Sequence, residues 1–439
     1  LSYRSVDLAQ SRFTINSAGA KQELKYADDF AAQSPAALDL SGELVFVGYG
    51  ITSPKNKHDD YAGLDVKGKI VVGISGTPET LRGVRLDSNE QGVGPAEAHG
   101  AAGAIFIEPQ YLLQWGMIKS YILRENAALP PPPTASGKEF PAFLGGPGFI
   151  RAIAKAMGKE ESYLTASAGK PLQPTAIPAS ASLKMVVAVK DAPPTYNVVG
   201  VLDGADPKLK NEYVVFSAHY DHLQTSNTGE VYNGADDDGS GTVGILEIAQ
   251  AFSLGQRSAR SILIIFHTGE EMGLLGSLYN TDYDPVVPLD KLVANFNIDM
   301  IGRSREEGNT DPRDKGLSDR DSVYVIGADK LSTELNKISE DTNSATARMK
   351  LDYTFNDESH PQRFYYRSDH YNYAKHGIPI IFYFTGVHRD YHRATDDIEK
   401  IDFEKMERIS RLVFATGWRV ANLSHRLVVD KKPSPAPSQ

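Results

Sequence analysis

The sequence predicts an α/β protein in which a mostly parallel mixed sheet, flanked by helices, is joined to a β-rich unit. From Tyr196 onward, short apolar runs alternate with segments of helical spacing, which is typical of an α/β fold. Several of these runs are apolar on both faces, as strands are in a parallel sheet that helices cover on both sides. The 439 residues leave room for two or three domains.

The first half of the chain divides into a polar segment and a β-rich segment. Residues 1–40 are polar and weakly periodic. After them, glycines separate apolar runs that we interpret as strands, over residues 44–47, 69–74 and 104–108. A proline-rich stretch at residues 129–147 predicts a loop within the first unit. A second one, at residues 170–178, is followed by a strand-like run over residues 183–189, and we place a domain boundary close to residue 183.

The second half supplies the predicted sheet and its helices. Buried strands are expected over residues 213–218, 261–268, 293–298, 323–326 and 378–384. Helical spacing predicts helices over residues 240–253 and 403–423, and a Pro/Ser-rich composition predicts a disordered tail over residues 431–439. Ligands of such sheets bind at the carboxyl ends of the strands, so the polar residues after each run are the candidates for a site.

Composition excludes several classes of function. The formal net charge of -10 and the lack of a Lys/Arg run argue against nucleic acid or an anionic membrane as a partner. No apolar run approaches the roughly 18 to 20 residues that span a bilayer. The chain has no cysteine, so thiol nucleophiles and Cys-ligated metals are excluded and any metal must be held by histidines and carboxylates. We find no Gly-x-Ser-x-Gly elbow after a strand and no nucleotide-binding loop between a strand and a helix.

Histidines and carboxylates follow the predicted strands at five places. These residues are His219 and Asp221, Asp236 to Asp238, Glu270 and Glu271, Asp299, and His392. Each alone is more often a structural residue than a ligand, but parallel strands bring their carboxyl ends to one edge of the sheet. Three carboxylates and a bridging hydroxide balance the charge of two divalent ions, and imidazole ligands favour zinc over magnesium and calcium. We therefore expect two Zn²⁺ ions per chain.

Local spacing gives neighbouring residues different roles. His219 and Asp221 are two apart on an extended segment, so their side chains leave the same face and Asp221 can accept a hydrogen bond from the imidazole. Glu270 and Glu271 are adjacent at a strand end and point in different directions, so one can bind metal while the other acts as a base. A solvated turn is the alternative for this pair, but the apolar strand before it favours a buried position.

Taken in order along the chain, these blocks resemble the M28 family of dizinc aminopeptidases. The resemblance covers roughly residues 196–424 and rests on six blocks, which are His219-x-Asp221, Gly234–Gly241, Thr268–Glu271, Asn297–Met300, Ser368–His370 and Tyr391–His392. In the first half, the segments Asp59–Tyr61, Val66–Val72 and Ala98–Phe106 resemble a protease-associated (PA) domain.

The resemblance implies a domain order and a set of metal ligands. Residues 1–40 would belong to the peptidase domain, residues 41–182 to an inserted PA domain, and residues 183–430 to the peptidase domain again. Asp237 would bridge the two zinc ions. His219 and Asp299 would complete one shell, and Glu271 and His392 the other.

The same resemblance implies how the site works. Glu270 matches the general base, which takes a proton from the water that bridges the zinc ions and returns it to the leaving amine. Asp221 would support the imidazole of His219. A cis peptide bond is expected between Asp237 and Asp238.

A tyrosine stabilises the oxyanion in this family. We favour Tyr365 because of its spacing from Ser368, with Tyr366 and Tyr391 in reserve, and aromatic packing is the alternative for all three. The two zinc shells leave no place for the other nearby histidines, so packing or supporting hydrogen bonds are expected for His222, His267, His370, His376 and His388.

The leading hypothesis is an aminopeptidase that removes N-terminal residues from peptides. A zinc carboxypeptidase or dipeptidase of the same fold would use the same metals, because specificity depends on variable loops. A non-catalytic binding protein with a PA domain is another class, and the five ligands together with Glu270 argue against it. A cyclase with one zinc would not need both His219 and Asp299.

Location and partners follow from the resemblance more than from composition. The expected location is secreted or periplasmic. The chain starts at Leu1 without an initiator Met and without a charged-then-apolar leader, so we expect a processed or truncated product. A peptide is the expected partner, and the sequence predicts neither the oligomeric state nor the preferred side chain. The acidic segment of residues 305–322 is expected to be a solvated insertion, with a structural cation as the alternative.

Overall fold

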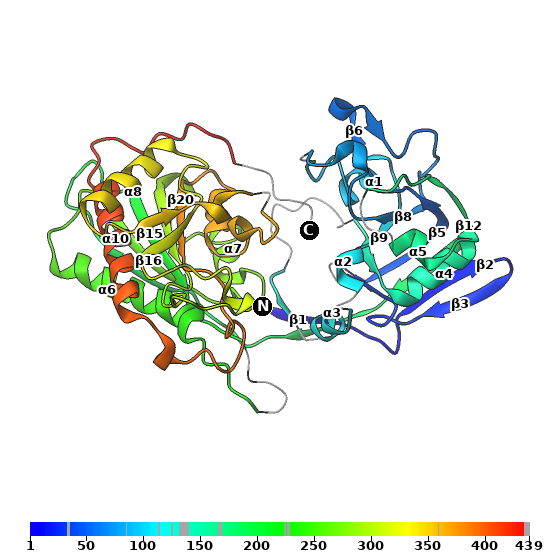
Figure 1. Cartoon of the computed structure of the whole chain (residues 1–439), viewed down its shortest axis with the longest axis horizontal. Helices are drawn as coiled ribbons and strands as arrows, with labels where there is room; N and C mark the ends of the chain where they lie inside the picture. The colour runs from blue at the N-terminus through cyan, green and yellow to red at the C-terminus, as the bar shows by residue number, and fades with distance from the viewer. Residues whose placement is uncertain are drawn as a thin grey trace. The chain divides into compact units, whose positions relative to one another are not determined.

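The computed structural model describes residues 1–32, 36–84, 86–112, 115–123, 126–130, 140–165, 169–223, 225, 229–358 and 360–433. These residues form two compact units, which divide between Pro193 and Pro194 (Figure 1). Each unit has its own apolar core.

Unit 1 is built on a mixed sheet with the strand order β3-β2-β12-β5-β8-β9-β11-β4, accompanied by a sheet of order β10-β1-β13 and the hairpin β6-β7. The strands are β1 Ser2–Val6, β2 Arg12–Ser17, β3 Ala20–Leu24, β4 Phe30–Ala32, β5 Leu38–Phe46, β6 Thr52–Ser53, β7 His58–Asp59, β8 Ile70–Ile74, β9 Gly103–Ile107, β10 Asn126–Ala128, β11 Ala142–Gly145, β12 Thr175–Met185 and β13 Val187–Asp191. The helices are α1 Val93–Ala98, α2 Pro109–Leu112, α3 Trp115–Ile122, α4 Pro147–Met157 and α5 Glu161–Thr165.

The position of residues 1–40 differs from the expectation that they belong with the peptidase domain. Strand β2 pairs with β12, with Phe13 opposite Leu183, so this segment lies in the sheet of unit 1. The physical reason is that Phe13 and Ile15 are apolar and fully buried in the unit 1 core. The boundary expected near residue 183 likewise lies about ten residues later, because β12 and β13 continue the sheets of unit 1.

Unit 2 is built on a mixed, mostly parallel sheet with the order β14-β16-β15-β17-β20-β18-β19, as the sequence predicts. Strands β16, β15, β17 and β20 run parallel, and β14 and β18 join them antiparallel. The strands are β14 Val198–Leu202, β15 Tyr213–His219, β16 Ser261–His267, β17 Leu292–Ile298, β18 Ser322–Ile326, β19 Lys350–Asp352 and β20 Ile380–Phe384. The helices are α6 Gly241–Leu254, α7 Leu275–Asp282, α8 Thr333–Ala345, α9 His370–Ala374 and α10 Phe403–Ala421, and the short helical segment η3 is Ala235–Ser240.

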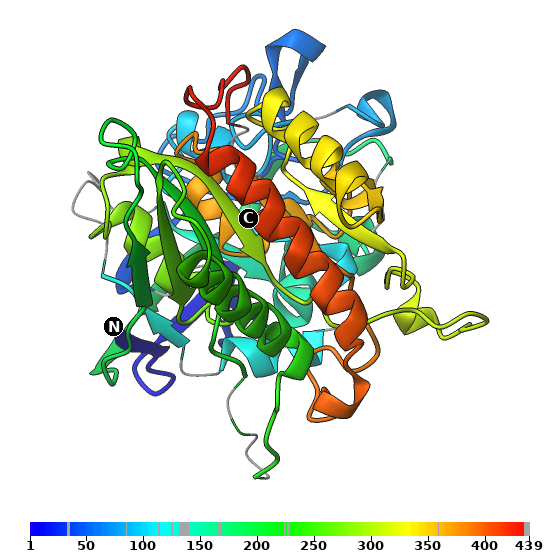
Figure 2. The same cartoon turned by 90° about the vertical axis from the view of Figure 1, so that its left-hand side faces the viewer.

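Helices cover both faces of the unit 2 sheet. Residues alternate between faces along a strand, so Val214 and Phe216 of β15 pack toward α6, α8 and α10, which lie side by side in Figure 2, while Val215 packs in the core beside α9. Gly417 allows α10 to approach the sheet, because a Cβ at this position would lie 2.2 Å from the Phe216 ring. The strands are therefore buried on both faces, and the strand ends are left for polar groups.

Two loop predictions fall partly outside the described residues. Residues 131–139 of the first proline-rich stretch and residues 434–439 of the tail lie outside the described residues. The rest of the first stretch is not a loop throughout, because Ala142–Gly145 forms strand β11 and Pro147 begins helix α4.

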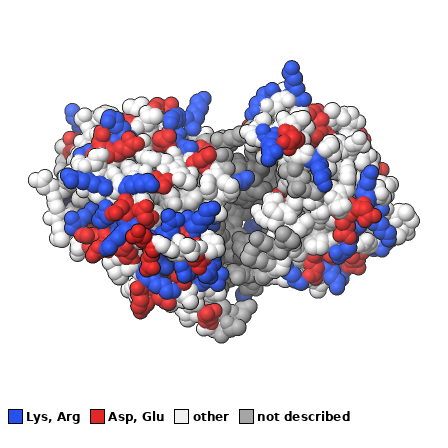
Figure 3. All heavy atoms as spheres, viewed as in Figure 1, with Lys and Arg blue, Asp and Glu red and all other residues white. Residues whose placement is uncertain are grey.

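The described surface matches the composition. On the face of unit 2 shown in Figure 3, basic and acidic side chains are interspersed. Among the described helices, none combines the length and the apolar character needed to cross a bilayer.

Candidate metal centre

The candidate site lies at the carboxyl ends of the parallel strands of unit 2. His219 is the last residue of β15, Glu270 and Glu271 follow β16, and Asp299 follows β17. His392 comes from the loop after β20. Asp237 lies in η3, the segment that leads into α6. Together with His219, Glu271, Asp299 and His392 it makes the set of five predicted ligands, while Glu270 is the predicted base.

The five predicted ligands form two groups that share Asp237. His219 Nε2 lies 3.2 Å from Asp237 Oδ1 and 3.7 Å from Asp299 Oδ1. His392 Nε2 lies 3.3 Å from Asp237 Oδ2 and 3.2 Å from Glu271 Oε2. One oxygen of Asp237 thus faces each group, which is the arrangement expected of a bridging carboxylate.

Several nitrogen and oxygen atoms that could bind a metal at this site are buried without a hydrogen bond to any described residue. They include His219 Nε2, Asp237 Oδ2 and Glu271 Oε1. Buried polar groups are normally satisfied, because leaving them unpaired costs about 1 to 3 kcal/mol each. Imidazole nitrogens and carboxylate oxygens aimed at common points are the donors that zinc prefers, so these residues fit that metal.

The imidazole of His219 is held by a backbone carbonyl. Its Nδ1 lies 3.0 Å from the carbonyl oxygen of Asp221, while the carboxylate Oδ1 of Asp221 is 3.8 Å away. This corrects the expectation that the carboxylate orients the ring. The carboxylate of Asp221 instead accepts hydrogen bonds from the backbone N–H groups of Glu270, at 3.1 Å, and Glu271, at 3.4 Å. Asp221 therefore positions the predicted base and a predicted ligand together.

The other two residues of the triple Asp are structural. Asp238 accepts hydrogen bonds from the backbone N–H groups of His219, Gly241 and Met300, which join β15, α6 and the end of β17. Asp236 accepts from the backbone N–H of Gly302 and lies 3.2 Å from His388 Nε2. The peptide bond between Asp237 and Asp238 is cis, which confirms the prediction.

Glu270 stands beside the two groups. Its Oε2 lies 3.9 Å from His219 Nε2, and its side chain is 11% exposed. Burial raises the pKa of the Glu270 carboxyl well above its usual range, and the nearby carboxylates of Asp299 and Asp369 add to this effect. Burial lowers the pKa of His392, but the carboxylates of Asp237 and Glu271 outweigh it and raise that pKa to about 9.

Comparison with known proteins identifies the family. The model of peptidase family M28 matches residues 197–417, which is half of the chain. The chain belongs to peptidase family M28. The matched range corresponds to unit 2 and contains all five predicted ligands and Glu270.

Individual relatives are distant. The aminopeptidase YwaD of Bacillus subtilis is 28% identical over 244 residues, which are 54% of this chain and 47% of that protein. A probable zinc metalloprotease of Pyrenophora teres f. teres is 29% identical over 245 residues, covering 51% of this chain and 48% of that protein. The chain thus spans about half the length of the curated relatives it matches. A solved aminopeptidase from Aneurinibacillus sp. strain AM-1 has the same fold, with a TM-score of 0.52 at 19% identity over 100% of this chain and 86% of that one.

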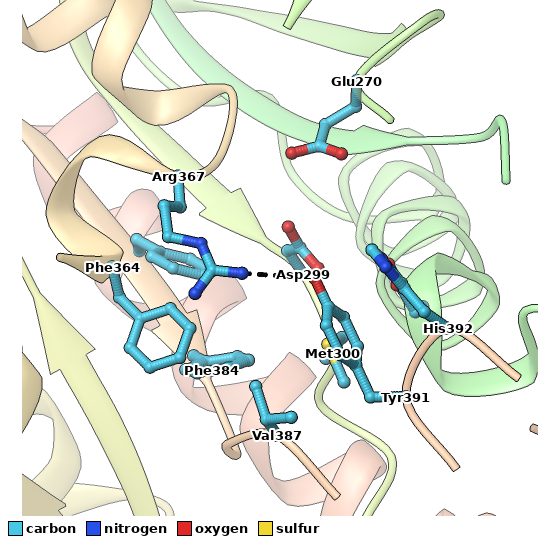
Figure 4. Close-up of a pocket in the computed structure, with 11 residues that line it drawn as sticks. Glu270, Asp299, Met300, Phe364, Arg367, Phe384, Val387, Tyr391 and His392 are labelled. Carbon is cyan, nitrogen blue, oxygen red and sulfur yellow. Dashed lines mark hydrogen bonds and ion pairs between the residues drawn. The ribbon is translucent and has the colours of Figure 1, made fainter. Parts of the chain in front are cut away.

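A pocket opens beside this M28 site. Figure 4 shows Glu270 on one side of it and Phe364 and Phe384 on the opposite side. Asp237, Asp299 and His392 line it together with apolar side chains from the strand ends and loops, which are Met300, Phe364, Phe382, Phe384 and Val387. The pocket therefore joins the carboxylates at one end to an end where Phe364 and Phe384 lie beside the guanidinium of Arg367.

The tyrosine favoured for the oxyanion lies elsewhere. Tyr365 is 2% exposed and packs against Tyr366 and Tyr371, because its segment turns the ring into the core instead of toward the pocket. Tyr391, one of the two held in reserve, lines the pocket, stacks on His392 at 3.8 Å between ring centroids, and accepts a hydrogen bond from Arg367 at 3.4 Å. The geometry thus favours Tyr391 over Tyr365.

Most of the remaining histidines have protein partners, as expected. His267 lies 3.1 Å from the Tyr373 hydroxyl, His370 lies 2.8 Å from the carbonyl oxygen of Tyr365, and His376 pairs with Asp282. His222 differs, because it lies against Glu271 at the metal site.

Sequence reasoning also missed two supporting residues. Ser368 donates a hydrogen bond to Asp299 Oδ2 at 2.7 Å, and Asn297 donates to Ser368 at 3.0 Å. Both lie in the blocks that carry the resemblance, which was the available signal.

Proposed function

We propose that this protein is a zinc aminopeptidase that removes N-terminal residues from peptides, and that two zinc ions would be held by His219, Asp237, Glu271, Asp299 and His392. The observation that carries the proposal is the position of the Asp237 carboxylate, whose two oxygens each face a histidine and a second carboxylate, with Glu270 beside them. An aminopeptidase and a probable zinc metalloprotease among the relatives support it.

Zinc bound here would acidify a water molecule and polarise the substrate carbonyl. Glu270 is placed to take the proton of the attacking water, because its carboxylate lines the pocket but is not needed by either ligand group. Tyr391 lines the same pocket and supplies a hydroxyl donor for the oxyanion.

The apolar side of the pocket suits the side chain of the residue that is removed. Phe364, Phe384 and Val387 lie opposite Glu270, with Arg367 beside Phe364. An apolar side chain can therefore pack against these three residues while the scissile bond lies at the end that carries Glu270.

Unit 1 is proposed to be a PA domain, and the protein to act in the periplasm or outside the cell. The support for the domain is local. Within the segment that resembles PA domains, Asp60 accepts a hydrogen bond from the Ile51 backbone and pairs with His58, while Val66 and Tyr61 pack in one apolar cluster.

The experiment that tests the function compares two substrates that differ only at the amine. The zinc-loaded protein is assayed on an aminoacyl anilide with a free α-amine and on the same compound N-acetylated. Turnover of only the free amine, abolished by a chelator and restored by zinc, is the expected result. Equal turnover of both compounds would indicate an endopeptidase or amidase. Turnover of neither would favour the carboxypeptidase, dipeptidase or binding-protein alternatives.

A further inference from the structure

We infer that His222 is a further metal ligand, on the Glu271 and His392 side of the centre, so that the two metal positions are chemically unequal. This inference rests on the proposed function in one respect, namely that metal ions bind at this centre. It adds a second imidazole to one position, while the position formed by His219, Asp237 and Asp299 has one.

The placement of His222 mirrors that of His392. His222 Nδ1 lies 2.8 Å from Glu271 Oε1, and His392 Nε2 lies 3.2 Å from Glu271 Oε2, so each oxygen of Glu271 faces one imidazole. His222 Nδ1 is also 3.9 Å from Asp237 Oδ2, the oxygen that faces His392. The two rings are edge to face, with their centroids 6.1 Å apart.

His222 has no other use for its nitrogens among the described residues. Its side chain is 11% exposed, and both ring nitrogens are buried without a hydrogen bond of proper geometry. His267 and His370, in contrast, each place one ring nitrogen within hydrogen-bond distance of a protein group. Two unsatisfied nitrogens on a buried ring are costly unless a ligand satisfies at least one of them.

The backbone leaves room for the ring at this place. Gly234 has a φ of 60° and lies directly against the imidazole, since a Cβ here would be 2.6 Å from His222 Cγ and 2.8 Å from Cδ2. A larger residue would push the ring away from Glu271. The loop before η3 thus accommodates His222 on the metal side.

Three of the four distances between the atoms that would bind the metal agree with a common ion, and the fourth, from His222 Nδ1 to Asp237 Oδ2, is longer at 3.9 Å. Donors that bind zinc at about 2.0 to 2.2 Å lie about 3.3 Å apart at tetrahedral angles and about 2.9 Å apart at right angles. The separations of His392 Nε2 from Asp237 and Glu271 are 3.3 and 3.2 Å, and that of His222 from Glu271 is 2.8 Å. The last value suits the right angle that a fifth ligand introduces.

The alternative role is a hydrogen bond from His222 that positions Glu271, and two variants separate the roles. In His222→Ala both the ligand and the hydrogen bond are lost. In His222→Gln an amide can still donate to Glu271, but it is a poor zinc ligand. The matched control is His376→Gln, because His376 pairs with Asp282 and does not line the pocket.

The experiment measures metal binding without activity. The metal-free full chain is titrated with zinc in competition with a chromophoric chelator, and the visible absorption of the cobalt-loaded protein reports the coordination number. Two zinc sites are expected in the unchanged protein and in His376→Gln. Both His222 variants should weaken one of these sites at least about tenfold, leave the other within about twofold, and change the cobalt spectrum.

The outcomes distinguish the inference from the function on which it rests. Two sites of unchanged affinity and an unchanged cobalt spectrum in His222→Gln would overturn the assignment of His222 as a ligand and leave the zinc centre intact. An unchanged protein that binds no zinc would overturn the proposed function and this assignment together. A variant that unfolds is recognised by circular dichroism, and the cobalt spectrum of the other variant then decides.

Discussion

In unit 1, the parallel strands β8 and β9 end next to Ser75 and Glu108, and these two side chains hydrogen-bond to each other. The other oxygen of Glu108 accepts a hydrogen bond from Gln110 at 2.6 Å. In unit 2, the corresponding strand ends carry His219 and Glu271. His219 Nε2 and Glu271 Oε1 are buried and have no hydrogen bond to a described residue. Polar residues at strand ends are therefore common to both units. The mark of a site is that such groups are buried, converge and lack protein partners.

We expect the largest effect, on kcat, from a change of the proposed base Glu270. Its counterpart for comparison is Glu108, which follows a strand end of unit 1. Glu270→Gln should lower kcat on a free-amine aminoacyl anilide by about 10² to 10⁴-fold, because the amide cannot accept the proton. Zinc content should stay unchanged, since Glu270 is outside both ligand groups. Glu108→Gln is the matched control and should leave kcat within about twofold. A Glu270→Gln protein that keeps more than a tenth of kcat would remove Glu270 from the role of base.

The second prediction separates stability in unit 1 from chemistry in unit 2. Phe149 is fully buried in the unit 1 core and stacks near Phe13, so Phe149→Ala should lower the unfolding free energy of unit 1 by about 3 to 5 kcal/mol. Arg151→Ala, at an exposed position of the same helix, should change it by less than about 0.5 kcal/mol.

Two tryptophans make this measurement selective. Trp115 lies in unit 1 and Trp418 in unit 2, and they are the chain's only two, so a Trp418→Phe background leaves a fluorescent probe of unit 1 alone during urea unfolding. We expect kcat of the folded Phe149→Ala protein to stay within about twofold. A tenfold loss in protein that is still folded would show that unit 1 contributes to the chemistry and would break the comparison.

The third prediction concerns the carboxylate that holds Glu270 and Glu271. Asp221→Asn should lower kcat and the affinity for zinc by about 10 to 100-fold, as is typical of residues that orient ligands. The reason is that the neutral amide offers one acceptor where the carboxylate accepts from two backbone N–H groups. Asp203→Asn, at an exposed position of the same unit, is the control. Equal activity of the two variants would show that the backbone of this loop needs no such support.

We expect the smallest effect, on the free energy of unfolding, from Asp314 of unit 2, whose charge already has protein partners. Asp314 is buried and accepts hydrogen bonds from the backbone N–H and the Nε of Arg389, both at 2.7 Å, and from Asn309 at 2.8 Å. Burial raises the pKa of Asp314, but the hydrogen bonds from Arg389 and Asn309 outweigh it and lower the pKa below 3.8.

The sign of the pH dependence follows from this lowered pKa. Folding stabilises the charged form of Asp314. Its contribution to the free energy of unfolding is therefore fully present above the ordinary Asp pKa of 3.8, which applies to the unfolded chain, and is lost as the pH falls through the pKa of the folded protein. Asp314→Asn should lower the free energy of unfolding by about 1 to 2 kcal/mol at pH 7. This difference from the unchanged protein should shrink as the pH falls below about 4. Urea unfolding at several pH values measures it, with exposed Asp321→Asn as the control. A difference that does not depend on pH would contradict the ionic origin.

The elements that the sequence predicts best are those with the simplest physics. The buried strands of unit 2 are apolar on both faces, and their order brings His219, Glu271 and Asp299 to one sheet edge without any knowledge of loops. Residues 1–40 could not be assigned in this way, because Phe13 pairs with Leu183, and a partner so distant in sequence leaves no local signal.

Side-chain direction in the loops was the harder part of the site. The sequence does not show that the Asp221 carbonyl, and not its carboxylate, faces His219, nor that Gly234 lies against the ring of His222. The same limit explains Tyr365, whose spacing from Ser368 suits the role but whose backbone directs the ring into the core.

The predicted ligands extend from residue 219 to residue 392 and come from four strand ends and the segment before α6. No part of this set exists in an unfolded chain, so metal can gain full affinity only after most of the unit 2 sheet has assembled. Zinc should then act as a reporter of folding, raising the midpoint of thermal unfolding of unit 2 in proportion to the logarithm of its free concentration. Unit 1 provides an internal reference, because both groups of residues that could hold a metal ion in the described part of the chain lie in unit 2.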